Sequence, residues 1–187
     1  MKEGKHRVSR VVTRTGDKGE SGLADGSRLP KQHPRFELMG ALDELNSSIG
    51  YLVSLGVDDT CRPLIEKVQQ TLFDVGSEAA APNASYLTEA DVEELDADCA
   101  SLNAGLPPLT EFVLPGGAPA GAYAHICRTL VRTAERRLSA LGETDFVNPA
   151  SRAWLNRLSD FFFILSRHLN LSAGAKEPQW RGPRKPS

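Results

Sequence analysis

Residues 123–142, YAHICRTLVRTAERRLSALG, contain the pattern that decides the fold. Apolar side chains recur there at steps of three or four residues, at Ile126, Leu130, Ala134, Leu138 and Leu141. Because an α-helix turns by about 100° per residue, this spacing places them on one side of a helix. The stretch therefore predicts a helix with an apolar face directed toward a core, and Ile126 is expected on that face.

The same spacing recurs on four more segments of the chain. Their stripes are Leu38, Leu42, Leu45, Ile49 and Leu52; Ile65, Val68, Leu72, Val75 and Ala79; Val92, Leu95, Cys99 and Leu102; and Leu155, Leu158, Phe162, Leu165 and Leu169. The predicted fold class is all-α, a five-helix up-and-down bundle over residues 34–172 in a single domain spanning 1–187. The architecture is that of a ferritin-like bundle. The four histidines form no HxxxH or ExxH pair, which argues against a di-iron or zinc site.

Composition and charge limit the function classes. With 22 Lys and Arg against 24 Asp and Glu, the net charge of −2 favours neither nucleic acid nor an anionic membrane. No apolar run approaches the roughly 20 residues of a membrane span, and residues 1–12 lack the apolar core of a secretory signal. Three cysteines without a CxxC pair favour free thiols in a reducing cytoplasm.

Three arginines, Arg128, Arg132 and Arg136, follow one another at steps of four in the quoted stretch. They cover an arc of about 80° on the helix surface, and Glu135 is the one acid among them. Such a row is either a solvated surface or a binding face for an oxyanion such as phosphate, which arginine is well suited to hold.

Polar side chains of two other predicted helices fit the same picture. Asn156, Asp160 and Arg167 lie close together in angle, off the apolar stripe of the last helix. Because asparagine has a low helix propensity, Asn156 is either a plain surface residue or a contact to a ribose or base edge. On the first helix Asp43 lies on the polar side, and Asp43 with Arg128 is a candidate buried ion pair.

The N-terminal region, residues 1–33, contains the glycine-rich stretch TRTGDKGESG at residues 13–22. This composition is poor material for a helix or a strand. Glycines let backbone N–H groups face an anion without a side chain in the way, and Arg14, Lys18 and Lys31 supply positive charge. The stretch matches neither a Walker A motif nor the dinucleotide-binding fingerprint. Taken alone, it is either a slack terminus or a phosphate-binding loop.

Two further segments are predicted to be non-helical. The link at residues 105–119, GLPPLTEFVLPGGAP, is rich in proline and glycine and yet carries Phe112, Val113 and Leu114. These apolar side chains either pack over the end of the bundle or line a ligand cavity. Residues 173–187 are expected to form a flexible tail.

Five separate segments resemble, in order and spacing, the motifs of PduO-type ATP:cob(I)alamin adenosyltransferases. They are TRTGDKGESGLADGSRLPK, GALDELNSSIG, EFVLPGG, HICRTLVRTAERR and WLNRLSDFFFILSR. The resemblance covers nearly the whole chain. One departure is Thr133, which stands where the family commonly has a second consecutive arginine, and it puts one cation at the phosphates or the interface in doubt.

The resemblance implies a homotrimer of five-helix bundles with ATP held between adjacent subunits. The implied reaction moves the 5′-deoxyadenosyl group of ATP to the cobalt of cob(I)alamin, a form of cobalamin, with magnesium on the ATP phosphates and no metal held directly by the protein. The N-terminal loop would contact ATP through Thr13, Arg14, Thr15, Gly16, Asp17, Lys18, Gly19, Ser21, Gly22 and Lys31. The helices of a neighbouring subunit would contact ATP through Arg132, Glu135, Arg136 and Asn156.

The resemblance also assigns residues to the chemical step. Arg132 and Arg128 would be catalytic, and Asp43 with Arg128 resembles the family's ion pair near the active site. Phe112 resembles the aromatic side chain on the lower axial side of the corrin. Because cob(I)alamin is itself a strong nucleophile, the protein needs no Ser–His or Cys–His pair. Its tasks are to stabilise charge on the leaving triphosphate and to make cobalt easier to reduce by displacing its lower ligand.

Two other functions remain open at this point. The chain is alternatively a non-catalytic carrier of ATP or adenosylcobalamin with the same fold, or a helical module whose arginine face docks an acidic partner. Binding without turnover would mark the carrier, and a lack of thermal stabilisation by ATP would mark the interaction module. The enzyme would have a cobalamin reductase and an adenosylcobalamin-dependent client enzyme as partners, without nucleic acid or membrane.

Overall fold

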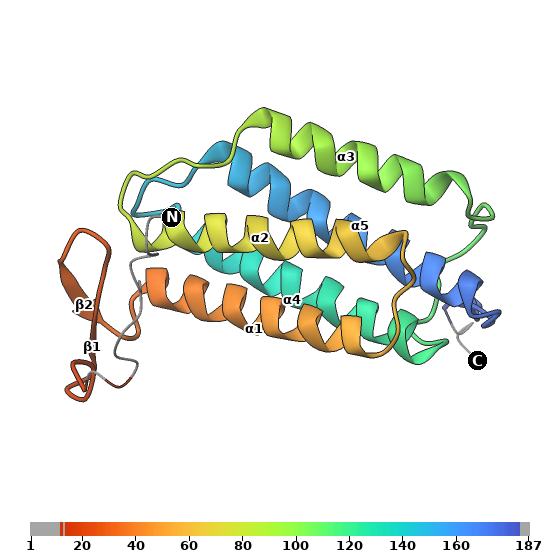
Figure 1. Ribbon diagram of the computed structural model, residues 1–187, viewed down its shortest axis with the longest axis horizontal. Coiled ribbons are helices and arrows are strands. Elements are labelled where there is room, and N and C mark those ends of the chain that lie inside the picture. Colours follow the sequence, from red (N-terminus) through yellow and green to blue (C-terminus); the bar gives the residue numbers. More distant parts are fainter. Residues whose placement is uncertain (1–11, 13, 184–187) are drawn as a thin grey trace, which may run out of the picture.

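The computed structural model describes residue 12 and residues 14–183. In this part of the chain the elements are a β-hairpin, β1 Glu20–Gly22 with β2 Arg28–Pro30, and five helices (Figure 1). The helices are α1 Pro34–Ser54, α2 Cys61–Ala80, α3 Glu89–Ala104, α4 Pro119–Leu141 and α5 Pro149–Ser172. The predicted five-helix bundle is confirmed, and the small sheet is an addition to it.

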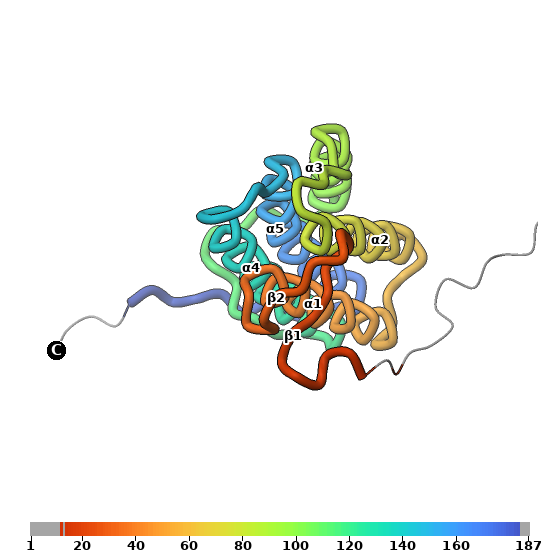
Figure 2. Tube along the Cα trace, turned by 90° about the vertical axis from the view of Figure 1, so that its left-hand side faces the viewer, coloured from red at the N-terminus to blue at the C-terminus, as the bar shows by residue number. Residues whose placement is uncertain are grey.

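The helices alternate in direction along the bundle. The hairpin, the end of α2 and the start of α5 lie at one end, whereas the link before α4 and the end of α5 lie at the other (Figure 1). Viewed along the bundle, α1, α2, α3, α5 and α4 follow one another around the core (Figure 2). The closest packing joins α4 to α5 and α1 to α4. The arginine-bearing helix α4 is therefore held between two neighbours.

The core is built from the apolar stripes that the sequence predicts. Every stripe residue of α1, α2 and α5 is buried. On α3, Leu95, Cys99 and Leu102 are buried and Val92 is partly buried. A capping box is present at the start of α3, where Thr88 and Asp91 bond to each other's side chain and backbone. Burial of apolar surface, at about 25 cal/mol per Å², is the main stabilising contribution of these stripes.

The buried stripe of α4 differs from the predicted one. Ile126 is 48% exposed, so its assignment to the core is wrong, and Leu130 is only partly buried. Successive steps of four residues each rotate the stripe by a further 40° or so, which carries its first members away from the core. The buried series alternates steps of three and four residues and so stays on one line; it contains Ala120, Ala124, Cys127, Val131, Ala134, Leu138 and Leu141.

The glycine-rich segment forms a hairpin where the sequence predicted no strand. The two strands pair antiparallel along all three of their residues. Asp25 accepts hydrogen bonds from the N–H and the hydroxyl of Ser27, at 2.9 and 2.6 Å, and Gly26 has a φ of 86°, which closes the turn. The Ala24 N–H donates to the Ala80 carbonyl at 2.9 Å and so fixes the hairpin to the end of α2.

An ion pair between buried Arg35 and partly buried Asp145 holds the start of α1 against the loop that follows α4. Arg35 donates from Nη2 to Asp145 Oδ1 at 2.6 Å and from Nη1 to the Ala79 carbonyl at 3.0 Å. The hydrogen bond from Arg35 holds the pKa of Asp145 below its usual value of 3.8, although burial opposes it. This pair connects α1, α2 and the α4–α5 loop at the end of the bundle that carries the hairpin.

Candidate active site

Residues of α4 and α5 that were predicted to bind a nucleotide lie together. Asn156 Nδ2 on α5 donates to Glu135 Oε1 on α4 at 3.0 Å. Arg132 and Arg136 are exposed on the same helix as Glu135, and Arg136 Nη2 donates to Thr133 Oγ1 at 3.0 Å. The arginine row and Asn156 therefore form one polar surface, here called the α4–α5 face: Arg132, Glu135, Arg136 and Asn156.

Arg128 lies closer to the core than the other arginines of this row. Its side chain is half-buried, and its Nε is buried without a hydrogen-bond partner among the described residues. Burial, followed by the neighbouring charge of Arg132, lowers the pKa of Arg128. Burial and the charge of Arg128 likewise lower the pKa of His125, whose ring bonds to Ser166. Arg128 thus carries a donor directed at no group of its own described chain.

The candidate ion pair between Asp43 and Arg128 is not formed within one chain. Asp43 is exposed on α1 and lines a hollow of about 260 Å³ between α1 and α2, together with Met39 and Phe73. Arg128 lies on α4, and the described ion pairs include no contact between the two side chains. A sequence shows that two residues are polar and outward-facing, but the pairing of charges depends on which helix surfaces meet.

The loop before and within the hairpin is compact rather than slack. Gly19 has a φ of 84° and its carbonyl accepts from the Lys31 N–H at 2.9 Å. A Cβ at Gly16 would lie 3.2 Å from Lys31 Nζ, so the glycine permits this close approach. Arg28, which the sequence analysis did not single out, donates to the carbonyls of Thr15 and Glu20 at 2.8 and 3.2 Å.

The remaining loop residues expected to contact ATP are located as follows. Arg14, Asp17, Lys18, Gly22 and Lys31 are exposed, and Ser21 is partly buried in β1. Thr13 lies outside the described residues. Among Arg14 and residues 16–31, no described hydrogen bond or ion pair reaches the α4–α5 face. The chain thus presents two separate sets of candidate ATP-binding residues.

Phe112 lies at the surface in the link before α4. Its side chain is 77% exposed and borders an open hollow of about 390 Å³ with Leu109 and Phe163. The Phe112 ring meets the ring of Trp180 edge to face, with centroids 6.2 Å apart. The Trp180 N–H donates to the Phe112 carbonyl at 2.8 Å. An exposed aromatic side chain on a backbone fixed in this way is suited to contact a flat apolar ligand.

The segment after α5 pairs with this link, whereas the sequence predicted a flexible tail from residue 173. Val113 forms an antiparallel bridge with Gln179, and the Leu114 N–H donates to the Pro178 carbonyl at 2.8 Å. Thr110 Oγ1 also donates to the Gln179 side chain at 2.9 Å. Residues 178–180 therefore serve as a short strand-like partner of the link in this structure.

Arg167 belongs to the same end of the bundle and not to the polar surface near Asn156. It is buried, donating to the Pro107 carbonyl at 2.7 Å and pairing with Glu177 at 3.2 Å. Asp160 remains exposed, as does Asn156. The three residues share one angle on α5, but only the last turns of α5 are covered by the link and the segment after α5. Helical angle alone could not reveal this cover.

Asn170 fixes the glycines of the link and was missed by the sequence analysis. Its Oδ1 accepts from the Ala118 N–H at 2.9 Å, and its Nδ2 donates to the Gly116 carbonyl at 3.0 Å. A Cβ on Gly117 or Gly121 would collide with the Asn170 side chain. The sequence signal that could have revealed it is an asparagine in the last turns of an otherwise apolar helix.

The described fold and site define an all-α bundle whose arginine face is suited to an anion and whose link presents an aromatic side chain.

Comparison with known proteins shows which family the chain belongs to. Residues 11–169 match the family described as cobalamin adenosyltransferase. A cobalamin adenosyltransferase of Cupriavidus metallidurans is 44% identical over 96% of this chain and 98% of its own length. A corrinoid adenosyltransferase of Homo sapiens is 40% identical over 91% of this chain and 73% of its own length. The chain belongs to the cobalamin adenosyltransferase family.

Solved structures agree with this assignment. A variant of the PduO-type ATP:corrinoid adenosyltransferase of Lactobacillus reuteri, complexed with cobalamin and ATP, has a TM-score of 0.87 at 29% identity and covers 92% of this chain and 97% of that one. A second variant of the same protein, complexed with ATP, has a TM-score of 0.84 at 31% identity. Within the described residues, no helix has both the length and the apolar character that crossing a membrane requires.

Proposed function

We propose that this chain transfers the 5′-deoxyadenosyl group of ATP to the cobalt of cob(I)alamin and releases triphosphate. The cobalt supplies two electrons to a new Co–C bond at the ribose 5′ carbon, and the C–O bond to the triphosphate breaks with its electron pair on oxygen. The observation that carries this proposal is the α4–α5 face, where Arg132 and Arg136 stand beside the bonded pair Glu135 and Asn156 in a member of this family.

The α4–α5 face supports binding of the triphosphate and the nucleoside. Exposed guanidinium groups hold phosphate oxygens through paired N–H donors, and they stabilise charge that develops on the leaving group. The amide of Asn156 and the carboxylate of Glu135 are held in place by each other, so they suit a ribose or base edge. Magnesium would be bound by the ATP phosphates and not by the protein, since the residues assigned to the phosphates are cations rather than metal ligands.

The link supports binding of the corrin. Phe112 is an exposed apolar ring on a backbone that is held by residues 178–180 and by Asn170. An apolar ring below cobalt excludes a lower ligand, and four-coordinate cobalt is easier to reduce. We assign Phe112 to this position.

We also propose that ATP binds between subunits of a homotrimer. Residues 16–31 and the α4–α5 face share no described bond within a chain, and neither do Asp43 and Arg128. Large apolar side chains are exposed on three helices, at Tyr51, Phe73 and Ile126, which favours contact with further copies.

The three free cysteines fit a reducing compartment such as the cytoplasm.

The activity is tested with ATP and chemically reduced cobalamin. The expected result is adenosylcobalamin with one triphosphate for each cobalamin converted. The proposal fails if no product forms while absorbance confirms cob(I)alamin. Tight binding of both substrates without product would instead favour the non-catalytic carrier.

Shared sites are tested by mixing two inactive variants. Lys31→Ala removes a loop cation, and Arg132→Ala removes a cation from the α4–α5 face; both residues are exposed. If each site combines the loop of one subunit with the face of another, random co-assembly leaves about a quarter of the sites intact. Co-expressed, differently tagged chains should therefore regain about that share of activity. No recovery in trimers shown by mass to contain both chains would place the two residues in one subunit's site.

A further inference from the structure

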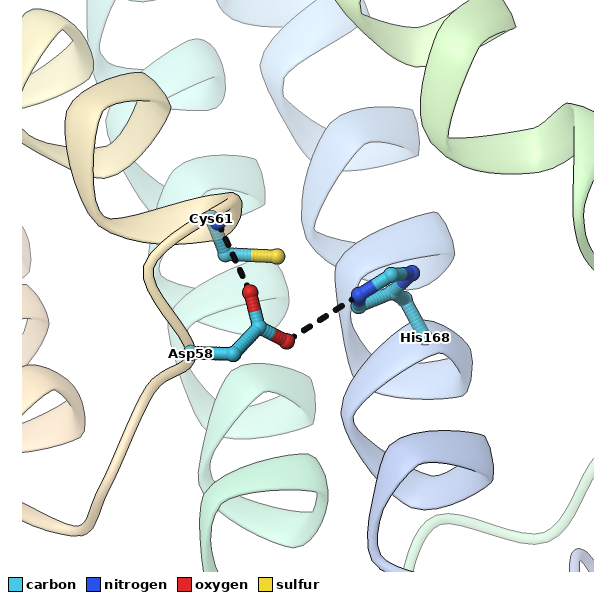
Figure 3. A group of neighbouring side chains, drawn as sticks. All are labelled: Asp58, Cys61 and His168. Atoms are coloured by element: carbon cyan, nitrogen blue, oxygen red, sulfur yellow. Dashed lines mark hydrogen bonds and ion pairs between the residues drawn. The ribbon is translucent and has the colours of Figure 1, made fainter.

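A cluster of potential metal ligands lies at the end of the bundle where α5 ends, and none of its three members is among the residues assigned to ATP or corrin. Asp58 precedes α2, Cys61 is its first residue, and His168 lies near the end of α5 (Figure 3). One ligand atom from each residue, a carboxylate oxygen, Sγ and a ring nitrogen, lies within 4.8 Å of the other two. We propose that Asp58, Cys61 and His168 bind a thiophilic divalent cation of the zinc type.

The donor set matches this class of cation. Zinc takes thiolate, imidazole and carboxylate ligands at about 2.0–2.3 Å in tetrahedral sites, where ligand atoms are about 3.5 Å apart. The three atoms here need to approach one another by only about an ångström, which small side-chain rotations provide. Magnesium and calcium prefer oxygen ligands and would not use the sulfur of Cys61.

Hydrogen bonds orient the carboxylate of Asp58 as a metal ligand. Its Oδ1 accepts from the backbone N–H groups of Thr60 and Cys61, at 3.0 and 2.9 Å. This leaves Oδ2 directed at His168 Nε2, 3.1 Å away. Burial alone would raise the pKa of Asp58, but the bonds from Cys61 and His168 outweigh it and the pKa is lowered, so the carboxylate is charged at neutral pH.

The surroundings give the cation a way in and a position for a fourth ligand. Asp58 lines a hollow of about 280 Å³ with Gly56, Pro119 and Ser172, and water reaching this hollow can complete a tetrahedron. Cys61 itself is buried, and burial with the nearby Asp58 carboxylate raises its pKa to about 12. Cation binding therefore releases the thiol proton to solvent, while the ring of His168 binds through Nε2 with its proton on Nδ1.

The spacing explains why sequence patterns do not reveal this group. Asp58 and His168 are separated by 110 positions, so no HxxxH or CxxC motif marks them. The bundle brings them together because the start of α2 and the end of α5 meet at one end. A cation held here would join α2 to α5 beside the start of α4.

The test uses Co²⁺ as a spectroscopic probe on the full chain without ATP or cobalamin. We expect one Co²⁺ per chain, with the visible bands of tetrahedral cobalt and a thiolate-to-cobalt charge-transfer band that Zn²⁺ abolishes. Cys61→Ser should remove the charge-transfer band. Cys99→Ser and Cys127→Ser are matched controls, because both cysteines are also buried and free, and both variants should keep it.

A second variant covers a failure of Cys61→Ser to fold. His168→Gln changes a partly buried side chain and should leave the fold intact. Loss of an outer-sphere partner lowers metal affinity about 10- to 100-fold, so loss of this direct ligand should lower it at least as much. Zn²⁺ should raise the unfolding temperature of the unmodified chain and not that of His168→Gln. A missing charge-transfer band, a band that survives in folded Cys61→Ser, or equal affinity in His168→Gln overturns the proposal.

Discussion

At the scale of the residue, two arginines differ in burial and in their partners. Arg35 is buried, and Asp145 and the Ala79 carbonyl satisfy its guanidinium inside the chain. Arg132 is exposed and makes no hydrogen bond or ion pair within the described residues. A guanidinium without internal partners can bind a phosphate without breaking a contact that stabilises the fold.

Replacing Arg132 with Ala should therefore lower turnover much more than stability. Loss of one preorganised donor to a developing oxyanion lowers kcat by about 10²–10³-fold, whereas an exposed substitution changes stability by about 0.5 kcal/mol or less. Adenosylcobalamin formation and urea unfolding measure the two effects. Arg137→Ala is the matched control, since Arg137 is exposed on the same helix and pairs with Glu37. Equal losses of activity and stability in Arg132→Ala would contradict a direct role.

Replacing Phe112 with Ala should affect the reduction of cobalt more than the transfer itself. In the lower axial position that we propose for Phe112, the smaller side chain would no longer exclude a ligand, so five-coordinate cob(II)alamin would persist and resist the reductant. We expect a slower reaction from cob(II)alamin with reductant and a smaller effect from preformed cob(I)alamin. Phe146→Ala, which truncates a half-exposed ring in the α4–α5 loop, serves as the control. Equal slowing from both starting states would argue against the lower axial position.

At the scale of the element, the sequence predicted most helices because packing on a core follows local periodicity. The stripes of α1, α2 and α5 are buried as expected. Two features were not predicted correctly, namely the exposure of Ile126 and the hairpin. Ile126 was placed by a four-residue step that does not stay on one line. The hairpin was not predicted although its turn at Asp25 and Gly26 is a local signal, whereas its attachment to Ala80 joins positions far apart in sequence.

The candidate site was predictable where one helix surface supplies it. The row of arginines on α4 could be derived from spacing alone, and the structure adds the bond that brings Asn156 to Glu135. Arg167 could not be placed, because its burial depends on a link and a following segment with no regular pattern. The partner of Asp43 could not be found either, since no described residue of the same chain provides it.

Replacing Asn170 with Ala should loosen the link before α4. The change removes two hydrogen bonds to the link and opens space where the Asn170 side chain contacts Gly117 and Gly121. We expect a loss of about 2 kcal/mol in the free energy of unfolding and weaker cobalamin binding, with ATP binding retained. Asn103→Ala, an exposed asparagine at the end of α3, is the control for helix propensity. Unchanged cobalamin affinity in Asn170→Ala would separate this residue from the corrin site.

At the scale of the whole molecule, the pair of Arg35 and Asp145 joins three parts of the bundle and makes stability depend on pH. The pKa of Asp145 is lower in the folded state than its usual 3.8. Its contribution is therefore fully present above about pH 5 and is lost as the pH falls through the folded pKa. Because the partner is a buried charge, Asp145→Asn should cost about 1.5–3 kcal/mol at neutral pH.

Unfolding by urea across pH 3–7 checks this expectation. The difference in stability between the original chain and Asp145→Asn should be constant near neutrality and should shrink below about pH 4. Asp160→Asn is a suitable comparison, because Asp160 is exposed and makes no described ion pair. A difference that stays constant down to pH 3 would show that the charge of Asp145 does not stabilise the fold.

An odd number of antiparallel helices makes the chain leave the bundle at the end opposite to the one where it enters. The hairpin marks the entry end, and residues 178–180 lie against the Phe112 link at the exit end (Figure 1). A bulky tag or surface anchor attached after residue 183 would therefore crowd the side of the chain that we propose to bind the corrin. On a sensor surface, anchoring through that end should slow cobalamin association and leave ATP association unchanged, whereas anchoring in the turn at Gly26 should do the reverse.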